Sequence, residues 1–192
     1  MPDVAAAALA MSDEPNQIGN AFRLAMRRTG QTVTVIACRD PKTGDRYGLT
    51  ASSVTSLSMT PPSILACING DASIQPYLEP GLMISINVLG ADQAQISHAF
   101  ATEPEPADRF RHGSWDDAPV TPELEEGKTE TPTPFLQDCA SCILARVVKT
   151  IPHSSHVIVI AEVQSAVTDP LRQPLIYHDG GYAQLTGIDD PE

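Results

Sequence analysis

Positive charge is scarce in this chain of 192 residues: Lys and Arg number 12 against 24 Asp and Glu, so the formal net charge is −12. Such an excess of carboxylates repels phosphate backbones and anionic lipid surfaces, which argues against nucleic acid as a partner. Long hydrophobic runs are also lacking, because no stretch approaches the roughly 20 apolar residues that span a bilayer. The Ala-rich residues 5–10 follow Asp3 and have no basic segment before them. We therefore expect a soluble, cytoplasmic protein with no membrane partner.

Cysteine is too sparse for a disulfide framework in a chain that is long enough to bury a core without staples. The four cysteines are Cys38, Cys67, Cys139 and Cys142. We expect reduced thiols and no bound metal. Cys139 and Cys142 have the spacing of redox and zinc sites, but no second such pair exists in the sequence. At i and i+3 in a strand their side chains would face opposite ways, which predicts that at least one belongs to the core.

Proline is plentiful by contrast, with 17 residues or about 9% of the chain against a usual ~5%, while charged residues reach only 19%. This balance favours strands joined by many turns. Apolar and β-branched runs predict strands at 32–38, from about 46, at 63–69, 82–89, 143–149 and 156–167, and a hairpin over 175–185. Strands and helices do not alternate regularly, so we expect a mainly β barrel or sandwich and no doubly wound sheet.

Helices are predicted at three places, namely 16–30, 73–79 and 92–101, the last two capped by Ser73 and Asp92. Residues 1–15 show no apolar period and are expected to be disordered. Residues 102–134 contain six prolines and nine carboxylates, which is typical of a long surface excursion. Its Trp115 either covers a pocket as part of a lid or anchors the loop on the barrel. We expect one domain at 16–187 and an acidic tail at 188–192.

Hydroxyl side chains crowd residues 48–62 (GLTASSVTSLSMTPP), where seven of fifteen residues are Ser or Thr. In an extended chain alternate residues share a face. One face would then carry Thr50, Ser52, Ser56, Ser58 and Thr60, and the packed face Leu49, Ala51, Leu57 and Met59. Hydroxyls donate and accept, so with free backbone N–H groups they can hold a phosphate and the polar edge of a heteroaromatic ring. The alternative is a Ser/Thr strand that simply faces solvent.

The same segment resembles the flavin-binding signature of the short-chain flavin reductases, the reductase components of two-component flavin-dependent monooxygenases. The matching residues are Gly48, Thr50, Ala51, Ser53, Ser56, Ser58, Pro61 and Pro62. Further matches occur in the family's order over roughly residues 18–186. They include Phe22, Arg23, Gly30, Asn69, Ser73, Asn87, Gln93, Phe100, Cys142, His156, Glu162, Tyr177, Gly180 and Tyr182.

This resemblance implies a homodimeric, FMN-binding split β-barrel of Greek-key type with a few short peripheral helices. It implies an NAD(P)H-dependent flavin reductase, an FMN reductase that transfers hydride from NADH or NADPH to FMN, with FAD possible as the flavin. The reduced flavin would diffuse to a partner monooxygenase. By the resemblance, Thr50, Ala51, Ser52 and Ser53 contact the flavin ring and ribityl chain, and Ser56, Ser58, Asn69 and Ser73 the ribityl-phosphate end. His156 would be the catalytic residue on the nicotinamide side, and Tyr182 an aromatic near the cofactor.

Two positions depart from the family pattern. Ser154 and Ser155 stand where the family usually has Gly-Asp, so a carboxylate that could orient His156 is missing. This keeps two alternatives open: a flavin-binding electron carrier or sensor without its own reductase turnover, and an oxidase acting directly on a small substrate. Thr60 replaces an Asp before the proline pair, an exchange expected to affect only a turn. Arg and Lys do not cluster in the sequence, which favours NADH over NADPH.

Overall fold

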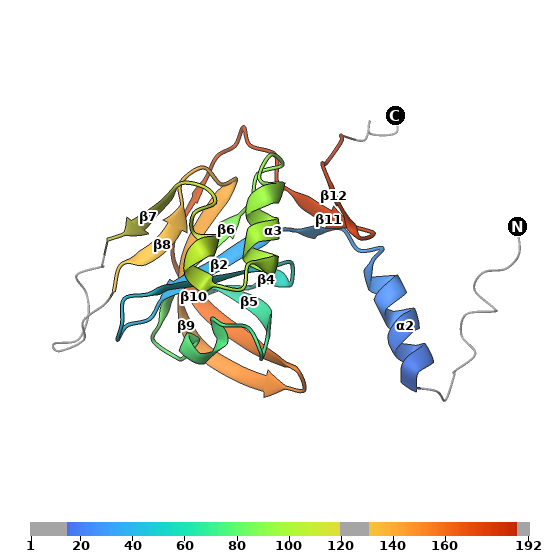
Figure 1. Ribbon diagram of the computed structural model, residues 1–192, viewed down its shortest axis with the longest axis horizontal. Coiled ribbons are helices and arrows are strands. Elements are labelled where there is room, and N and C mark those ends of the chain that lie inside the picture. Colours follow the sequence, from blue (N-terminus) through green and yellow to red (C-terminus); the bar gives the residue numbers. More distant parts are fainter. Residues whose placement is uncertain (1–14, 120–130, 188–192) are drawn as a thin grey trace, which may run out of the picture.

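The computed structural model describes residues 15–119 and 131–187, and an antiparallel sheet dominates it (Figure 1). Seven strands pair in the order β3-β2-β6-β9-β10-β5-β4. Their bounds are β2 Thr34–Arg39, β3 Arg46–Ala51, β4 Val54–Met59, β5 Pro62–Asn69, β6 Met83–Val88, β9 Ser141–His153 and β10 His156–Thr168. The prediction of a mainly β fold is confirmed. No helix in these two ranges is long and apolar enough to cross a membrane.

Smaller elements surround this sheet. β1 Gln31–Thr32, β11 Ile176–His178 and β12 Gly181–Ala183 form a three-stranded sheet, and β7 Trp115–Ala118 pairs with β8 Thr133–Leu136. The helices are α2 Pro15–Met26, α3 Ala94–Thr102, α4 Pro106–Arg109 and the short 3-10 helix η1 Gln75–Tyr77. In Figure 1, α3 covers the sheet while α2 projects away from it beside β11 and β12.

The sheet has an opening between β3 and β4. These strands are consecutive in the chain, yet they lie at opposite edges of the sheet and are joined only by residues 52–53. The backbone N–H of Cys67 on β5 donates to the carbonyl of Ser53 at 3.0 Å, which fastens this link to the sheet. Among the described strands, neither β3 nor β4 therefore has a strand partner on the side that faces the opening.

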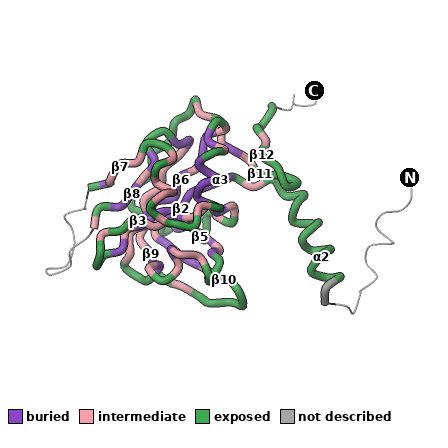
Figure 2. Tube along the Cα trace, viewed as in Figure 1, coloured by how far each residue is buried: buried purple, intermediate pink, exposed green. Residues whose placement is uncertain are grey.

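The core has two parts, which Figure 2 shows as the purple interior of the barrel. One lies inside the sheet and includes Ile36, Ile68, Ile84 and Ile86, all at most 1% exposed. The other lies between α3 and the sheet and includes Phe100 of α3 with Val35, Leu89, Leu136 and Leu175. Strand alternation explains both parts, because residues i and i+2 point to the same face. Asn87 is buried between them and bonds to the backbone of Val35 and Leu136 at 3.0 and 2.9 Å.

The predicted elements are largely present, with local differences. Helix α2 begins at Pro15, inside the segment 1–15 that was expected to be disordered, and ends at Met26 rather than near residue 30. Neither Ser73 nor Asp92 caps a helix. Residues 75–77 form only η1, and the cap position of α3 is Gln93, whose side chain instead bonds to Gly90 N and Asp138 O. The predicted tail at 188–192 and residues 1–14 lie outside the described residues.

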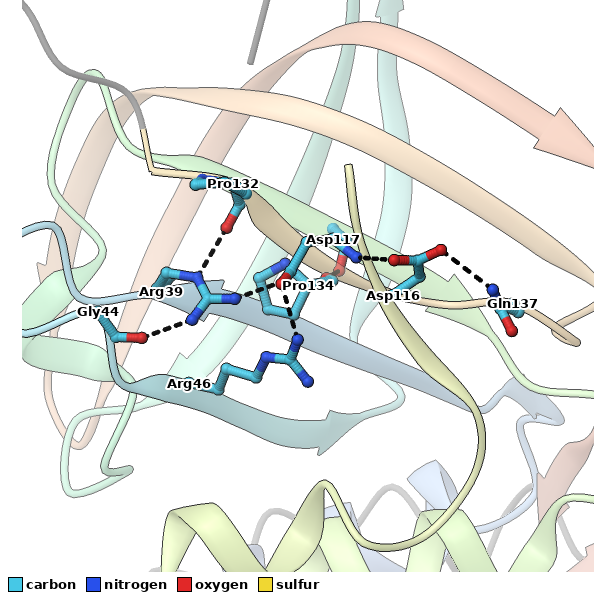
Figure 3. A network of polar contacts seen from close by, with 9 residues as sticks. Arg39, Gly44, Arg46, Asp116, Asp117, Pro132, Pro134 and Gln137 are labelled. Carbon is cyan, nitrogen blue, oxygen red and sulfur yellow. Dashed lines mark hydrogen bonds and ion pairs between the residues drawn. The ribbon is translucent and has the colours of Figure 1, made fainter. Parts of the chain in front are cut away.

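The expected excursion over 102–134 contains α4, β7 and the start of β8, and its residues 120–130 lie outside the described part of the chain. A polar network fastens it to the barrel (Figure 3). The Asp117 carboxylate accepts from the guanidinium groups of Arg39 at 2.5 Å and Arg46 at 2.8 Å. Burial raises the pKa of Asp117, but the hydrogen bonds and charges of the two arginines outweigh it and hold that pKa below its ordinary value.

Candidate functional site

The hydroxyl-rich segment does not form one extended strand. β3 ends at Ala51, the chain turns at residues 52–53, and the register of β4 against β5 shifts between Ser56 and Ser58. The prediction of one shared hydroxyl face is therefore wrong for the set Thr50, Ser52, Ser56, Ser58 and Thr60. The prediction of a packed opposite face is also wrong for Leu57 and Met59, which are 49% and 80% exposed.

A recess of about 410 Å³ lies at the opening between β3 and β4. Ser52, Ser53 and Thr55 bring hydroxyl groups to it from the link and from β4. Its other walls come from residues 30–32 around β1, and from Val54, Leu65 and Cys67. Neutral hydroxyls thus stand next to apolar side chains in one concave site, a combination that suits a ring with one polar edge.

A second recess of about 340 Å³ adjoins the first, because Gln31 and Ser52 line both. Arg23 of α2 and Arg27, which directly follows the helix, line it together with Tyr177 of β11. The Arg27 guanidinium already has an internal partner, because it forms an ion pair with the Asp179 carboxylate at 3.3 Å. The expectation that Arg and Lys do not cluster is therefore wrong at this place: Arg23 on α2 and Arg27 just beyond its end both line the recess next to the hydroxyl-lined one.

Thr50 and Tyr182 meet at a residue that sequence reasoning missed. The Thr50 hydroxyl donates to the carbonyl of Ser97 at 2.7 Å, and the Tyr182 hydroxyl donates to the Ser97 hydroxyl at 2.9 Å. Ser97 lies on the buried side of α3. A small polar residue among the apolar positions of a predicted helix was the only signal for it. These bonds tie β3 and the β11–β12 hairpin to one helix.

Ser73 also has a partner that the sequence did not reveal. The Arg109 guanidinium donates through Nη1 to the carbonyl of Gly48 at 2.6 Å and to the Ser73 hydroxyl at 3.2 Å. Its Nε donates to the carbonyl of Glu103 at 2.8 Å. Burial lowers the pKa of Arg109, yet an arginine stays charged at any physiological pH. Gly48 and Ser73, both matches to the family pattern, are therefore held by one cation.

Asn69 and His156 face each other as register partners on β5 and β10, and both are exposed. Neither lines the two recesses described above. The Asn69 side chain accepts from the backbone of Asp71 at 3.0 Å, and the His156 Nδ1 is hydrogen-bonded to the Ser155 hydroxyl at 2.9 Å. Ser155 thus occupies the orienting position at which the sequence lacks a carboxylate.

The remaining predicted site residues lie apart from the recess. Ala51 is buried, while Ser56 is exposed on β4. The Ser58 hydroxyl bonds to the backbone of Thr60, as donor at 3.1 Å and as acceptor at 3.0 Å, so it stabilises the turn before β5. Trp115 packs against Phe100 and Phe110, with ring centroids 5.1 and 4.9 Å away. Its packing favours the anchoring alternative over the lid.

Comparisons with known proteins relate this chain to one family. A family model described as "Flavin reductase like domain" matches residues 26–186. The reductase component of the FADH(2)-dependent resorcinol hydroxylase of Rhizobium sp. (strain MTP-10005) is 34% identical over 171 residues, 88% of each chain. The FMN reductase (NADH) RutF of Enterobacter sp. (strain 638) is 30% identical over 164 residues, 85% of this chain and 92% of RutF.

A solved structure confirms the predicted split-barrel fold. The NADH:FAD oxidoreductase SgcE6 of Streptomyces globisporus C-1027 superposes with a TM-score of 0.75 over 95% of this chain and 96% of its own, at 23% sequence identity. Fold, family model and relatives therefore lead to one assignment, which the residues at 48–62 had already indicated. The chain belongs to the flavin reductase like domain family.

Proposed function

We propose that this protein is an NADH-dependent flavin reductase that uses FMN or FAD, works in the cytoplasm and supplies reduced flavin to a partner monooxygenase. The observation that carries the proposal is the hydroxyl-lined recess at the opening between β3 and β4. The printed names of the relatives support it, since one is an FMN reductase (NADH) and the other the reductase component of a hydroxylase. NADPH is the alternative nicotinamide, because Arg23 and Arg27 line the adjoining recess.

The residues at the opening fit a flavin by their chemistry. A flavin combines a planar ring with a polar edge, a polyol chain and a phosphate. Val54 and Leu65 offer apolar walls to the ring, while the hydroxyls of Ser52 and Ser53 suit its polar edge and the polyol. Thr50 and Ala51 would contribute backbone groups. For the phosphate end we retain Ser73, now with Arg109 beside it, together with Ser56 and Asn69. The Ser58 hydroxyl is engaged in the turn at Thr60 and is not included in this set.

The protein's own part in the reaction is to bind and orient. The chemistry that a bound flavin supplies is the acceptance of a hydride from the reduced nicotinamide. Ser52 and Ser53 would fix the ring's angle, and the apolar walls exclude water. Backbone N–H groups at residues 52–53 would stabilise negative charge at the ring's polar edge. His156, held by Ser155, would hydrogen-bond the nicotinamide side, and Tyr182 would border the cofactor from its position beside Ser97.

Oxidation of NADH and NADPH by the purified protein, with and without added FMN, FAD or riboflavin, tests the proposal. The expected result is fast oxidation of the nicotinamide that requires added flavin. The combination of nicotinamide and flavin that reacts fastest identifies the cofactors. Tightly bound flavin with negligible turnover would instead support the electron-carrier alternative.

In the same assay His156→Ala should lower turnover, while His153→Ala at the other side of the hairpin turn serves as the matched control. Equal turnover of His156→Ala and the parent would remove His156 from the mechanism.

We also propose that a second copy of this chain covers α2. The helix exposes Ile18, Phe22, Leu24 and Met26, which are 41–65% exposed, and Figure 2 shows its described burial as green. Apolar side chains concentrated on a projecting helix are typical of an interface. β4 adds Leu57 and Met59. Sedimentation analysis should give a dimer, and Phe22→Asp should shift it to monomer, whereas Gln17→Asp on the same helix should not. A monomeric parent protein would contradict this.

A further inference from the structure

Cys139 and Cys142 line a pocket that shares no residue with the hydroxyl-lined recess or its neighbour. The pocket measures about 400 Å³ and is also lined by Leu144, Val167 and Arg172. Cys139 lies in the turn before β9 rather than in the strand, so both cysteines reach one cavity. The expectation that their side chains face opposite ways is therefore wrong. Within the described residues, no group of three or more His, Cys, Asp or Glu could hold a metal ion.

The two thiols are chemically unequal. A hydrogen bond from the Cys142 thiol lowers the pKa of Cys139 against the effect of burial, helped by the backbone and by the charge of Arg172. The same hydrogen bond, together with burial, raises the pKa of Cys142. Arg172 is held in place because it donates to the carbonyl of Asp138 and pairs with Asp92 at 3.3 Å. Cys139 is therefore the better nucleophile of the two, and Cys142 stays protonated.

Cys38 provides the contrast within the same molecule. Its thiol is fully buried in the barrel core, and burial together with the nearby Asp40 raises its pKa to about 12. It lines neither the dithiol pocket nor the recess at the opening. A thiol that is neither ionised nor accessible is unreactive toward oxidants.

We propose that Cys139 and Cys142 form a modification site, a dithiol that hydrogen peroxide converts reversibly into a disulfide. The Cys139 thiolate attacks the peroxide, the O–O bond breaks, and a sulfenic acid forms while the released hydroxide takes up a proton as water. The Cys142 sulfur then attacks the sulfenic sulfur, an S–S bond replaces the S–O bond, and the leaving oxygen departs with the Cys142 proton as a second water. The thiols lose two electrons and the peroxide gains them.

A source of this oxidant follows from the proposed function. Reduced flavin that meets oxygen before reaching a monooxygenase passes two electrons and two protons to it, which yields oxidised flavin and hydrogen peroxide. This part of the inference rests on the proposed function, whereas the reactivity of the dithiol toward peroxide does not. The disulfide would join the turn after β8 to the first residues of β9, where Cys142 lies opposite Asn87 of β6 and Val167 of β10.

Peroxide treatment of the full-length protein, without flavin or nicotinamide, tests the dithiol directly. The expected result is the loss of two of the four free thiols, with a mass decrease of about 2 Da in the peptide that carries Cys139 and Cys142, reversed by dithiothreitol. Retention of all four thiols, or oxidation of Cys139 to a sulfinic acid without a link to Cys142, would overturn the proposal.

Single serine variants assign the two roles. Cys142→Ser should stop at a sulfenic acid on Cys139 that dimedone traps, whereas Cys139→Ser should lose the peroxide reaction at this site. Cys38→Ser is the matched control and should form the disulfide like the parent. Trapping on Cys142 in the Cys139→Ser variant at the parent rate would contradict the assignment. Circular dichroism establishes that each variant is folded.

A second experiment tests the dithiol proposal and the proposed function independently of each other. During turnover with NADH, FMN and oxygen, the same disulfide should appear, and catalase should prevent it. If NADH is not oxidised at all, the proposed function fails while the added-peroxide result still decides the dithiol. If NADH is oxidised and peroxide accumulates but the thiols stay free in both experiments, the dithiol proposal fails alone.

Discussion

Phenylalanine side chains have opposite surroundings on the α3 side and on the α2 side of this molecule. Phe100 on the buried side of α3 is 2% exposed and packs edge-to-face on Phe110 and beside Trp115, whereas Phe22 on α2 is 65% exposed. On the α3 side the polar groups are also satisfied within the chain, as the Arg39–Asp117–Arg46 network shows (Figure 3). The α2 side has exposed apolar residues, hydroxyls and an open sheet edge. The first side therefore explains stability, and the second is where a ligand or a partner completes the structure.

Removing the aromatic ring on the closed side should have the largest effect. Phe100→Ala is expected to lower the free energy of unfolding by about 3–5 kcal/mol, because it leaves a cavity among rings that cannot collapse into it. Leu171→Ala, at a position that is 91% exposed, is the control and should stay within about 0.5 kcal/mol. Urea denaturation of both variants measures the difference. Equal midpoints would mean that the closed side is not the stable one.

Breaking the network in Figure 3 should have the next largest effect. Asp117→Ala leaves Arg39 and Arg46 partly buried without their shared carboxylate and should cost about 1–3 kcal/mol in unfolding free energy. Asp108→Ala removes only the exposed ion pair of Asp108 on α4 with Arg111 beyond the helix end and should cost much less. Thermal unfolding of the two variants at neutral pH compares them. A larger loss for Asp108→Ala would contradict the importance of the network.

Acid should weaken the same network in a defined direction. The pKa of Asp117 is lower in the folded protein than in the unfolded chain, so the unfolded state takes up the proton first as pH falls. The stabilisation is present above the unfolded pKa of about 4 and is lost as pH falls through the folded value. Asp117→Asn should be less stable than the parent protein at neutral pH, and this difference in unfolding free energy should become smaller as the pH is lowered. Unfolding midpoints of both proteins across this pH range give the pH dependence of their stability. Parallel curves would show that the Asp117 carboxylate does not contribute to it.

The smallest effect is expected at the open side. Ser53→Ala should weaken flavin binding by about 0.5–1.5 kcal/mol, roughly twofold to tenfold in Kd, because one hydroxyl bond is lost while the apolar walls remain. Ser58→Ala is the matched control, since its hydroxyl serves the turn at Thr60. Flavin fluorescence titration measures both affinities. A stronger effect of Ser58 than of Ser53 would place the flavin elsewhere along β4.

Sequence reasoning located the strands because local alternation decides them. Residues 63–69 and 156–167 were predicted as strands and correspond to β5 and β10. The hydroxyl face failed for a physical reason: a turn at 52–53 and a register shift after Ser56 interrupt the alternation, and no local signal marks either. Ser97 and Arg109 were missed because their roles depend on contacts with β3, which lies 47 and 61 residues away. The exposure of α2 could not be foreseen, since its periodicity predicts a helix but not what covers it.

The position of β5 beside β10 has a consequence for how the chain folds. The hairpins β2–β3, β4–β5 and β9–β10 pair strands that follow each other directly. By contrast, β5 and β10 bring Ser63 next to Glu162 and Asn69 next to His156, across about half of the chain. Loop closure over such a separation costs entropy before any contact offsets it. We expect the hairpins to gain amide protection early in pulsed hydrogen exchange and the β5–β10 pairing to gain it last, so that the barrel is completed only one strand away from its opening.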